Sequence, residues 1–325
     1  MSTAKPRIVV TDYAFSDLNI ERDLVNAAHY DFEGGQCKTE AALIDLFRDA
    51  DAVITQFARI SPNVINAMTR AKVIVRYGIG VDNVDLEAAR LRKIPVCNIP
   101  DYCIDEVADH ALAFILATTR QVVPHTNHLH SGQWGLVGTI QGMRVLRDQT
   151  VGVVGFGRIG RAVVKRLLAF GTRVVVFDPV VAASEIEKLG AQPLALDDLL
   201  KAADIVTLHC PSLPQTRKMI NAQSLGSMKR GAILINVGRG DLVDVPALMG
   251  ALTSGHISAA ALDVFDPEPI PADHPVLKCA NVILAPHIAS ASPAAMKKLR
   301  ETAATLALKA VRFEPLPSIV NGVKA

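Results

Sequence analysis

Neither sign of charge dominates this sequence, and it has no long apolar run free of charged residues. Its 34 lysines and arginines balance 32 aspartates and glutamates, for a formal charge of +2. Neither sign forms a block of the kind that binds nucleic acid or a membrane surface. The longest apolar stretch, near residues 108–117, contains Asp109 and His110, and the N-terminus lacks the pattern of a signal peptide. We therefore expect a cytoplasmic protein with no nucleic-acid partner and no membrane span.

Cysteine pairs with the spacing of a zinc site or a redox disulfide are also absent. The five cysteines are Cys37, Cys97, Cys103, Cys210 and Cys279. Their odd number and irregular spacing indicate reduced, structural thiols. His125, His128 and His130 lie close together, but no acidic residue or cysteine lies near them in sequence to complete a metal site. We expect these histidines to be solvated and predict no metal.

Aromatic residues make up only 5% of the chain, whereas hydrophobic residues of all kinds make up 50%. Small and branched apolar residues suit packed helices and buried parallel strands. Short apolar runs alternate with amphipathic stretches, which is typical of repeated strand–helix units and predicts an α/β fold. A length of 325 residues favours two domains.

The pattern predicts two series of strands. The first comprises residues 7–11, 52–55, 73–76 and 95–97, and the second 150–154, 173–177, 205–208, 232–236, 258–262 and 281–284. Ser61 followed by Pro62 predicts the start of a helix. A long helix is expected from 105 to about 119, then an irregular stretch to 149. A last helix, 293–312, is expected to rejoin the first domain.

A glycine-rich turn follows the first strand of the second series. The sequence TVGVVGFGRIG places glycines at Gly155, Gly157 and Gly160 directly before a helical pattern. These glycines permit a tight turn, backbone approach to a pyrophosphate and close helix–strand packing, in that order. Asp178 stands 18 residues after Gly160 at a strand end, where a carboxylate accepts hydrogen bonds from ribose hydroxyls and repels a 2′-phosphate. The segment predicts NAD in preference to NADP.

Three chemically suggestive residues follow later strands: Arg239, Glu268 and His287. Ligands bind beyond the carboxyl ends of strands in open parallel sheets. A guanidinium can hold a carboxylate, a histidine can exchange a proton near neutral pH, and a glutamate can orient that histidine. Each residue also has a structural explanation, as a surface cation, a turn residue between prolines and a capped loop histidine respectively. The spacing alone leaves both interpretations open.

Six ordered stretches resemble the D-isomer-specific 2-hydroxyacid dehydrogenase family across essentially the whole chain. They are RYGIGVDNVD (76–85), VGFGRIG (154–160), LHCPSLPQT (208–216), INVGRGDLVD (235–244), ALDVFDPEP (261–269) and APHIAS (285–290). The resemblance implies that Arg239, Glu268 and His287 form the active site. It also implies an NAD-dependent oxidoreductase that interconverts a small 2-keto acid and the D-2-hydroxy acid.

Further roles follow from the resemblance only. It implies that the backbone amides of Gly78 and Ile79 bind the substrate carboxylate and that Gly238 and Asp263 contact the nicotinamide region. The remaining cofactor contacts that it implies are Arg158 and Ile159 at the pyrophosphate, and Cys210, Pro211 and Thr216 near the adenine and ribose. Two departures from the family pattern, Gly238 for a small side chain and Asp109 for a glutamate, leave the three active-site residues intact.

The residues before Gly78 are weaker candidates. In the branch similar to C-terminal-binding proteins and to phosphoglycerate and glyoxylate/hydroxypyruvate reductases, the arginine at the position of Arg76 can help to hold substrate. Arg76 could equally be a structural ion-pair partner. Tyr77, Tyr102 and Trp134 are candidates for substrate specificity, or for packing in the core or an interface.

The resemblance predicts two Rossmann-like domains with a cleft between them. A flavodoxin-like substrate domain would comprise residues 1–101 and 291–325, and a doubly wound NAD-binding domain residues 102–290, with hinges just after Tyr102 and near Ile288. A homodimer is expected through residues 105–149. The alternative function is an NAD(H)-sensing, corepressor-like binding protein with residual dehydrogenase activity. A formate dehydrogenase is disfavoured because glutamine usually replaces the glutamate, and an L-lactate or malate dehydrogenase because the glycine turn would lie near the N-terminus.

Overall fold

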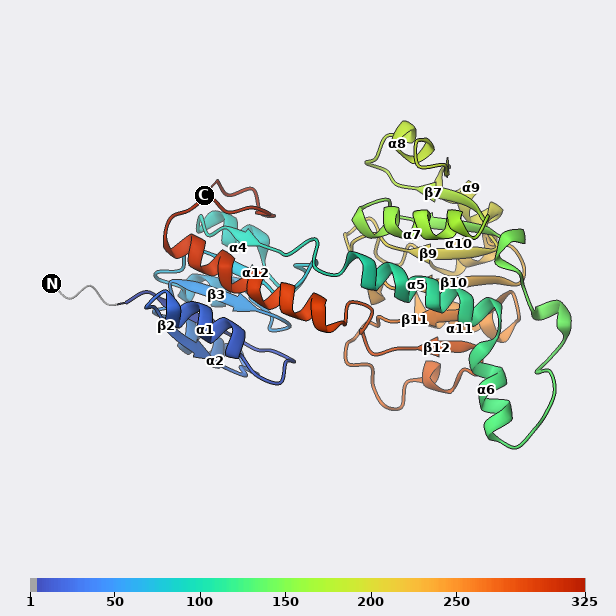
Figure 1. The fold of residues 1–325 in the computed structure, drawn as a ribbon, viewed down its shortest axis with the longest axis horizontal. Coiled ribbons are helices and arrows are strands. Elements are labelled where there is room, and N and C mark those ends of the chain that lie inside the picture. Colours follow the sequence, from blue (N-terminus) through green and yellow to red (C-terminus); the bar gives the residue numbers. More distant parts are fainter. Residues whose placement is uncertain (1–4, 325) are drawn as a thin grey trace. The chain divides into compact units, whose positions relative to one another are not determined.

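The computed structural model describes residues 5–324. The chain divides into two compact units, one formed by Met1–Tyr102 with Ser292–Ala325 and the other by Cys103–Ala291. Each unit contains one sheet, and every pair of neighbouring strands in both sheets is parallel. The predicted α/β class with two Rossmann-like units is therefore confirmed (Figure 1).

The N-terminal unit has a five-stranded sheet with the order β2-β1-β3-β4-β5. Its strands are β1 (Arg7–Val10), β2 (Asp31–Gly34), β3 (Ala52–Thr55), β4 (Ile74–Arg76) and β5 (Val96–Cys97). Its helices are α1 (Asn19–Ala27), α2 (Glu40–Phe47), α3 (Pro62–Ala67), α4 (Leu86–Leu91) and α12 (Pro293–Val311). The sequence pattern did not predict β2, because this edge strand, DFEG, is mostly exposed and has no apolar run.

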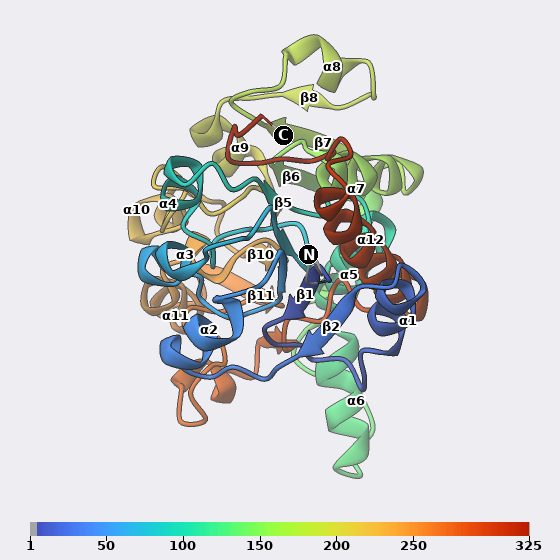
Figure 2. The same cartoon turned by 90° about the vertical axis from the view of Figure 1, so that its left-hand side faces the viewer.

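Alternate residues of these strands pack on opposite faces of the sheet, as the pleat requires. Ile8 and Val10 belong to a core with residues of α1 and α12, whereas Val9 belongs to a core with residues of α2, α3 and α4. Figure 2 shows α1 and α12 side by side. The predicted start of α3 is confirmed, since the Ser61 side chain accepts a hydrogen bond from the Val64 amide and Pro62 follows it.

The second unit has a seven-stranded sheet with the order β12-β11-β10-β9-β6-β7-β8. Its strands are β6 (Thr150–Val154), β7 (Arg173–Phe177), β8 (Gln192–Pro193), β9 (Ile205–Leu208), β10 (Ala232–Asn236), β11 (Ile257–Leu262) and β12 (Val282–Leu284). Its helices are α5 (Ile104–Thr119), α6 (Val122–His130), α7 (Arg158–Ala169), α8 (Ala183–Glu187), α9 (Leu196–Ala202), α10 (Ala222–Ser227) and α11 (Val245–Thr253). The strand order reverses between β6 and β9, where doubly wound sheets bind their ligands.

The stretch expected to be irregular after residue 119 contains helix α6, so that expectation was wrong. No residue of α6 is buried, and the sequence therefore shows no apolar stripe of helical period. His125 contacts the backbone at both ring nitrogens, with Nδ1 2.8 Å from the Gln121 carbonyl and Nε2 3.2 Å from the Val137 amide. In residues 5–324 no group of three potential ligands is placed to hold a metal. All five cysteines are free thiols.

Over the same residues, none of the helices has both the length and the apolar content needed to cross a bilayer.

Candidate active site and cofactor-binding turn

The glycine turn joins β6 to α7, and each glycine has a distinct structural reason. Gly155 has a φ of +98°, and a Cβ there would lie 2.7 Å from the Cys210 backbone nitrogen. A Cβ at Gly160 would overlap the Gly155 carbonyl, so this position admits no side chain. A Cβ at Gly157, in contrast, would meet nothing within 4 Å. The turn therefore presents an open backbone surface at the start of the helix, which suits a pyrophosphate.

The N-terminal turn of α7 supplies the next two predicted cofactor contacts. Arg158 is exposed and Ile159 is half-buried. The helix is 12 residues long and its N-cap, Gly157, has no side chain. Amide groups at such a helix start attract a negatively charged ligand. The guanidinium of Arg158 is exposed beside them and would add positive charge.

Asp178 lies at the end of β7 and is held by backbone amides. Its Oδ2 atom accepts a hydrogen bond from Phe156 (2.7 Å), inside the glycine turn. Its Oδ1 atom accepts hydrogen bonds from Val180 (2.9 Å) and Val181 (3.0 Å). A carboxylate carries more acceptor capacity than these bonds use. Asp178 thus fixes the turn and keeps a negative charge beside it, which fits ribose hydroxyls and opposes a 2′-phosphate.

The loop after β9 contains Cys210, Pro211 and Thr216. The Thr216 hydroxyl donates to the Pro211 carbonyl (2.7 Å) and accepts from the Leu213 amide (2.8 Å), which closes the loop on itself. Burial raises the pKa of the Cys210 thiol to about 11, so Cys210 stays neutral near physiological pH. These three residues follow β9, the neighbour of β6 at the switch point, where an adenine or ribose would be expected.

Arg239 is positioned by a buried asparagine at the end of β10. Asn236 is 1% exposed; its Nδ2 donates to the Arg239 carbonyl (2.8 Å) and its Oδ1 accepts from the Gly238 amide (3.0 Å). The Arg239 Nη1 atom donates to the Gly238 carbonyl (2.7 Å). At Gly240 a Cβ would overlap the backbone of Phe265. The arginine loop is therefore packed directly against the loop that follows β11.

Glu268 and His287 form a hydrogen-bonded pair within the second unit. The His287 Nδ1 atom lies 2.7 Å from the Glu268 Oε2 atom, and the Glu268 Oε1 atom accepts from the Phe265 amide (2.8 Å). Burial opposes ionisation, but the hydrogen bonds from His287 and Phe265, with the charges of His287 and Arg239, hold the pKa of Glu268 below its ordinary value. The carboxylate is therefore ionised near neutral pH.

Asp263 supports the loop that carries His287. The carboxylate is 1% exposed and accepts hydrogen bonds from the amides of Ile288 and Ala289, both 2.9 Å. The Asp263 carbonyl accepts from the His287 amide (2.7 Å). His287 has a φ of +54°, a conformation that non-glycine residues rarely adopt and that such contacts can enforce. On α5, the His110 Nε2 atom lies 3.8 Å from the Asp263 Oδ1 atom.

The predicted carboxylate-binding loop follows β4 in the N-terminal unit. Gly78 has a φ of +142°, and a Cβ there would overlap the Arg76 guanidinium, which lies against the glycine. The Gly78 amide donates to the Arg76 carbonyl (2.8 Å), whereas the Ile79 amide has no protein acceptor in residues 5–324. The Tyr77 side chain is 1% exposed. Any contact of Tyr77 with a substrate would thus be through its backbone.

We did not name Asn236, which positions Arg239, or His110, which lies near Asp263, from the sequence. Asn236 is the first residue of the N-x-x-R-G element, so the motif that identified Arg239 contained the signal. His110 gave no such signal, because its neighbour Asp263 is distant in sequence, directly after β11, and only the fold brings α5 to that strand.

The chain belongs to the D-isomer-specific 2-hydroxyacid dehydrogenase family. The family model described as "D-isomer specific 2-hydroxyacid dehydrogenase, NAD binding domain" matches residues 112–289, which contain the glycine turn, Asp178 and all three candidate active-site residues. Glyoxylate reductase from Korarchaeum cryptofilum is 36% identical over 326 residues, covering 98% of this chain and 96% of that protein. The family and the NAD-binding domain predicted from the sequence are confirmed.

Other relatives include longer proteins. D-3-phosphoglycerate dehydrogenase from Mycobacterium tuberculosis is 38% identical over 274 residues, or 84% of this chain, but this chain spans only 51% of its length. Among solved structures, the TT0316 protein from Thermus thermophilus is 37% identical with a TM-score of 0.87, covering 97% of this chain and 99% of that one. D-Lactate dehydrogenase from Aquifex aeolicus, complexed with NAD and lactic acid, is 28% identical with a TM-score of 0.86, covering 94% and 96%.

Proposed function

We propose that this protein is an NAD-dependent dehydrogenase that interconverts a small 2-keto acid and the corresponding D-2-hydroxy acid. The observation that carries the proposal is the 2.7 Å contact between His287 Nδ1 and Glu268 Oε2, in the same unit as the glycine turn. Relatives named glyoxylate reductase and D-3-phosphoglycerate dehydrogenase support the reaction class.

His287 is the proposed acid and base. Because its Nδ1 atom faces Glu268, its Nε2 atom is the one available to donate a proton to the carbonyl oxygen of a keto acid. Bound NADH supplies the hydride for reduction. In the oxidation direction, neutral His287 accepts the hydroxyl proton. Reduction should therefore weaken as pH rises and oxidation should strengthen.

Arg239 is the proposed anchor for the substrate carboxylate and carbonyl. A guanidinium can bind a carboxylate through two parallel hydrogen bonds, which orients the carbon that reacts. The backbone amides at Gly78 and Ile79 are the proposed second anchor. Since the Gly78 amide already donates to the Arg76 carbonyl, we assign the larger share of carboxylate binding to the Ile79 amide. Arg76, whose guanidinium lies against Gly78, is a further candidate for the same anion.

A substrate panel tests this function directly. The purified protein would be assayed with glyoxylate, hydroxypyruvate, pyruvate, 2-oxobutyrate and phosphohydroxypyruvate, each with NADH and with NADPH. We expect turnover of at least one small keto acid, with a preference for NADH. Absence of turnover with every substrate would refute the proposal, and a clear preference for NADPH would refute the role of Asp178.

We also propose a homodimer. Large apolar side chains are exposed along α6 and the loop after it, including Leu129 (56%), Trp134 (92%), Leu136 (55%) and Ile140 (66%). Exposed apolar side chains that lie close together in sequence on one segment are typical of protein interfaces. Light scattering after gel filtration should give twice the chain mass, and Trp134→Glu should reduce it. The cytoplasmic location expected from the sequence stays a prediction.

A further inference from the structure

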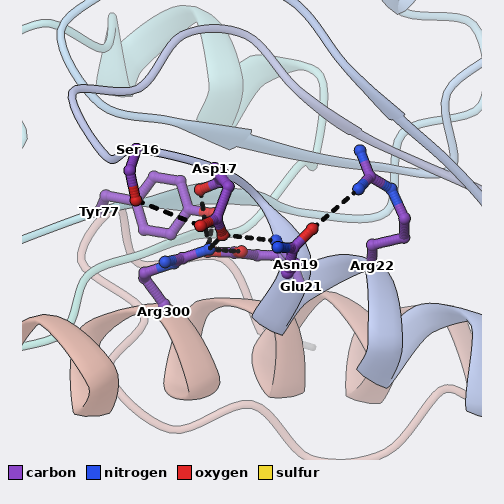
Figure 3. Close-up of polar contacts among 7 residues, drawn as sticks. All are labelled: Ser16, Asp17, Asn19, Glu21, Arg22, Tyr77 and Arg300. Atoms are coloured by element: carbon purple, nitrogen blue, oxygen red, sulfur yellow. Dashed lines mark hydrogen bonds and ion pairs between the residues drawn. The ribbon is translucent and has the colours of Figure 1, made fainter.

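A buried carboxylate lies at the centre of a network in the N-terminal unit (Figure 3). Glu21, in the first turn of α1, is 0% exposed. Its Oε1 atom accepts hydrogen bonds from Arg300 Nε (2.9 Å) and from the Tyr77 hydroxyl (2.9 Å), and its Oε2 atom accepts from Arg300 Nη2 (2.7 Å). Arg300 is 7% exposed and Tyr77 1%. The three side chains come from α12, α1 and the loop after β4.

Stability alone does not readily explain this network. Removing a charge from water is costly, and replacing a buried ion pair with apolar residues is often neutral or stabilising. Arg300 is further held by Asp17, whose side chain and carbonyl accept from Nη2 at 3.1 and 2.8 Å. Burial, together with the charge of Glu21, raises the pKa of Tyr77 well above its ordinary value, so the hydroxyl remains a hydrogen-bond donor.

Tyr77 directly precedes the proposed carboxylate-binding peptide. Its amide donates to the Thr55 carbonyl (2.8 Å), and its ring packs edge-on against Phe15 with centroids 5.3 Å apart. Its side chain is therefore fixed on the face of the sheet that α1 and α12 cover. On the C-terminal side of Tyr77, the Gly78 carbonyl accepts from the Ile99 amide (2.9 Å).

The carbonyl groups on both sides of the Ile79 amide are held by hydrogen bonds. A trans peptide is planar, with its N–H pointing opposite to its C=O. Because the Gly78 carbonyl points to Ile99, the Ile79 N–H points the other way. The Ile79 carbonyl is held in turn by Asn98 Nδ2 (2.7 Å). The direction of the Ile79 N–H is therefore set by hydrogen bonds from Ile99 and Asn98, which follow β5, and the residue before this peptide is the anchored Tyr77.

We propose that Tyr77, held by Glu21 and Arg300, is a positioning residue that orients the Gly78–Ile79 peptide for the substrate carboxylate. The inference rests on the function proposed above and adds a residue that positions the substrate-binding peptide. Arg300 lies on α12, which begins directly after Ser292, where the chain returns from the NAD-binding unit. The network therefore connects this helix to the substrate loop through side chains alone.

Steady-state kinetics of Tyr77→Phe test the proposal. The variant keeps the ring and loses one hydrogen bond to a charged group. We expect KM for the keto acid to rise about threefold to tenfold with kcat within about twofold. The dissociation constant of NADH, measured by its fluorescence, should not change, because the glycine turn lies in the other unit. Arg300→Lys keeps the charge but not the paired hydrogen bonds, and we expect the same direction of change.

Asp51→Asn provides the matched control. Asp51 is also buried, at 3% exposed, and accepts a hydrogen bond from Arg70 (2.9 Å), but it precedes β3 and so lies at the opposite end of the sheet from the substrate loop. The Asp51→Asn variant should have a lower melting temperature than the wild type without a higher KM. If Tyr77→Phe and Arg300→Lys lower the melting temperature and leave KM at the wild-type value, or if Asp51→Asn raises KM equally, the positioning role is refuted and the proposed function stands. If the wild-type protein reduces no keto acid, both fail.

Discussion

Replacing Glu268 by glutamine perturbs the proposed acid–base pair with little change in shape. The amide can still contact His287 but carries no negative charge. In the mechanism that we propose, Glu268 stabilises a proton on the imidazole wherever the carboxylate is ionised. Because the pKa of Glu268 lies below its ordinary value, the stabilisation persists at neutral pH and is lost only in acid, as pH falls through that lowered pKa. The variant lacks it at every pH.

The size of the effect follows from the geometry. Two unit charges about 4 Å apart interact by about 4 kcal/mol at an effective dielectric of about 20. The side chains of His287 and Glu268 are 37% and 35% exposed, so water screens part of this. A hydrogen bond to a charged group is worth about 1.5–3 kcal/mol. We therefore expect kcat for keto-acid reduction to fall about 10- to 100-fold in Glu268→Gln.

The assay follows NADH absorbance over a pH series in both directions. The pH at which reduction declines should move down in Glu268→Gln, because the negative charge that favours the protonated imidazole is lost. Oxidation should retain its rate to lower pH than in the wild type, because neutral His287 is favoured.

Glu185→Gln is the control for this experiment. Glu185 is a carboxylate in the same unit, but it is paired with Lys188 on the surface (2.7 Å), and its loss should leave both pH profiles unchanged. Unaltered profiles in Glu268→Gln would refute the assignment of His287 and Glu268 as the acid–base pair.

Three further changes probe the remaining parts of the site. Asp178→Asn should raise the ratio of NADPH to NADH use about tenfold, because the charge that repels a 2′-phosphate is removed; kinetics with both cofactors measure it, and an unchanged ratio would contradict the role. Asn236→Ala should lower kcat/KM for the keto acid about tenfold by freeing the Arg239 loop; an unchanged kcat/KM would contradict this role. Gly160→Ala should destabilise the second unit by more than about 2 kcal/mol in urea unfolding, since its Cβ would overlap the Gly155 carbonyl; a stable variant would show that helix and strand can separate.

The second unit was the more predictable one from sequence. Strands β6, β7, β9 and β10 begin and end where the apolar runs do, because a buried parallel strand is apolar on both faces. β8 has only two residues, Gln192 and Pro193, and no apolar run marks it. Helix α6 does contain apolar side chains, but none of its residues is buried, so the sequence shows no apolar stripe that would predict a helix packed on the core.

The residues of the candidate site also differ in how far the sequence could predict them. The residues that we propose to act directly on a ligand, Arg239, Glu268 and His287, lie within short motifs and could be named from the sequence. The positioning role that we propose for Tyr77 and Arg300 could not be predicted from the sequence, because these residues are separated from Glu21 by 56 and 279 positions along the chain and share no motif with it.

Tyr77 illustrates why this division arises. As a letter in RYGIG it suggests a specificity residue, but the fold turns its side chain into the core, where Glu21 satisfies the hydroxyl. Leaving the buried Tyr77 hydroxyl without an acceptor would cost free energy. The contact with Glu21 therefore restricts the backbone of Tyr77, which Gly78 and Ile79 directly follow in sequence. Substrate affinity should then depend on a helix that no sequence motif connects to the substrate, which the paired kinetics of Tyr77→Phe and Arg300→Lys measure. If both act through Glu21, their combined effect on KM should be smaller than the product of the two single effects.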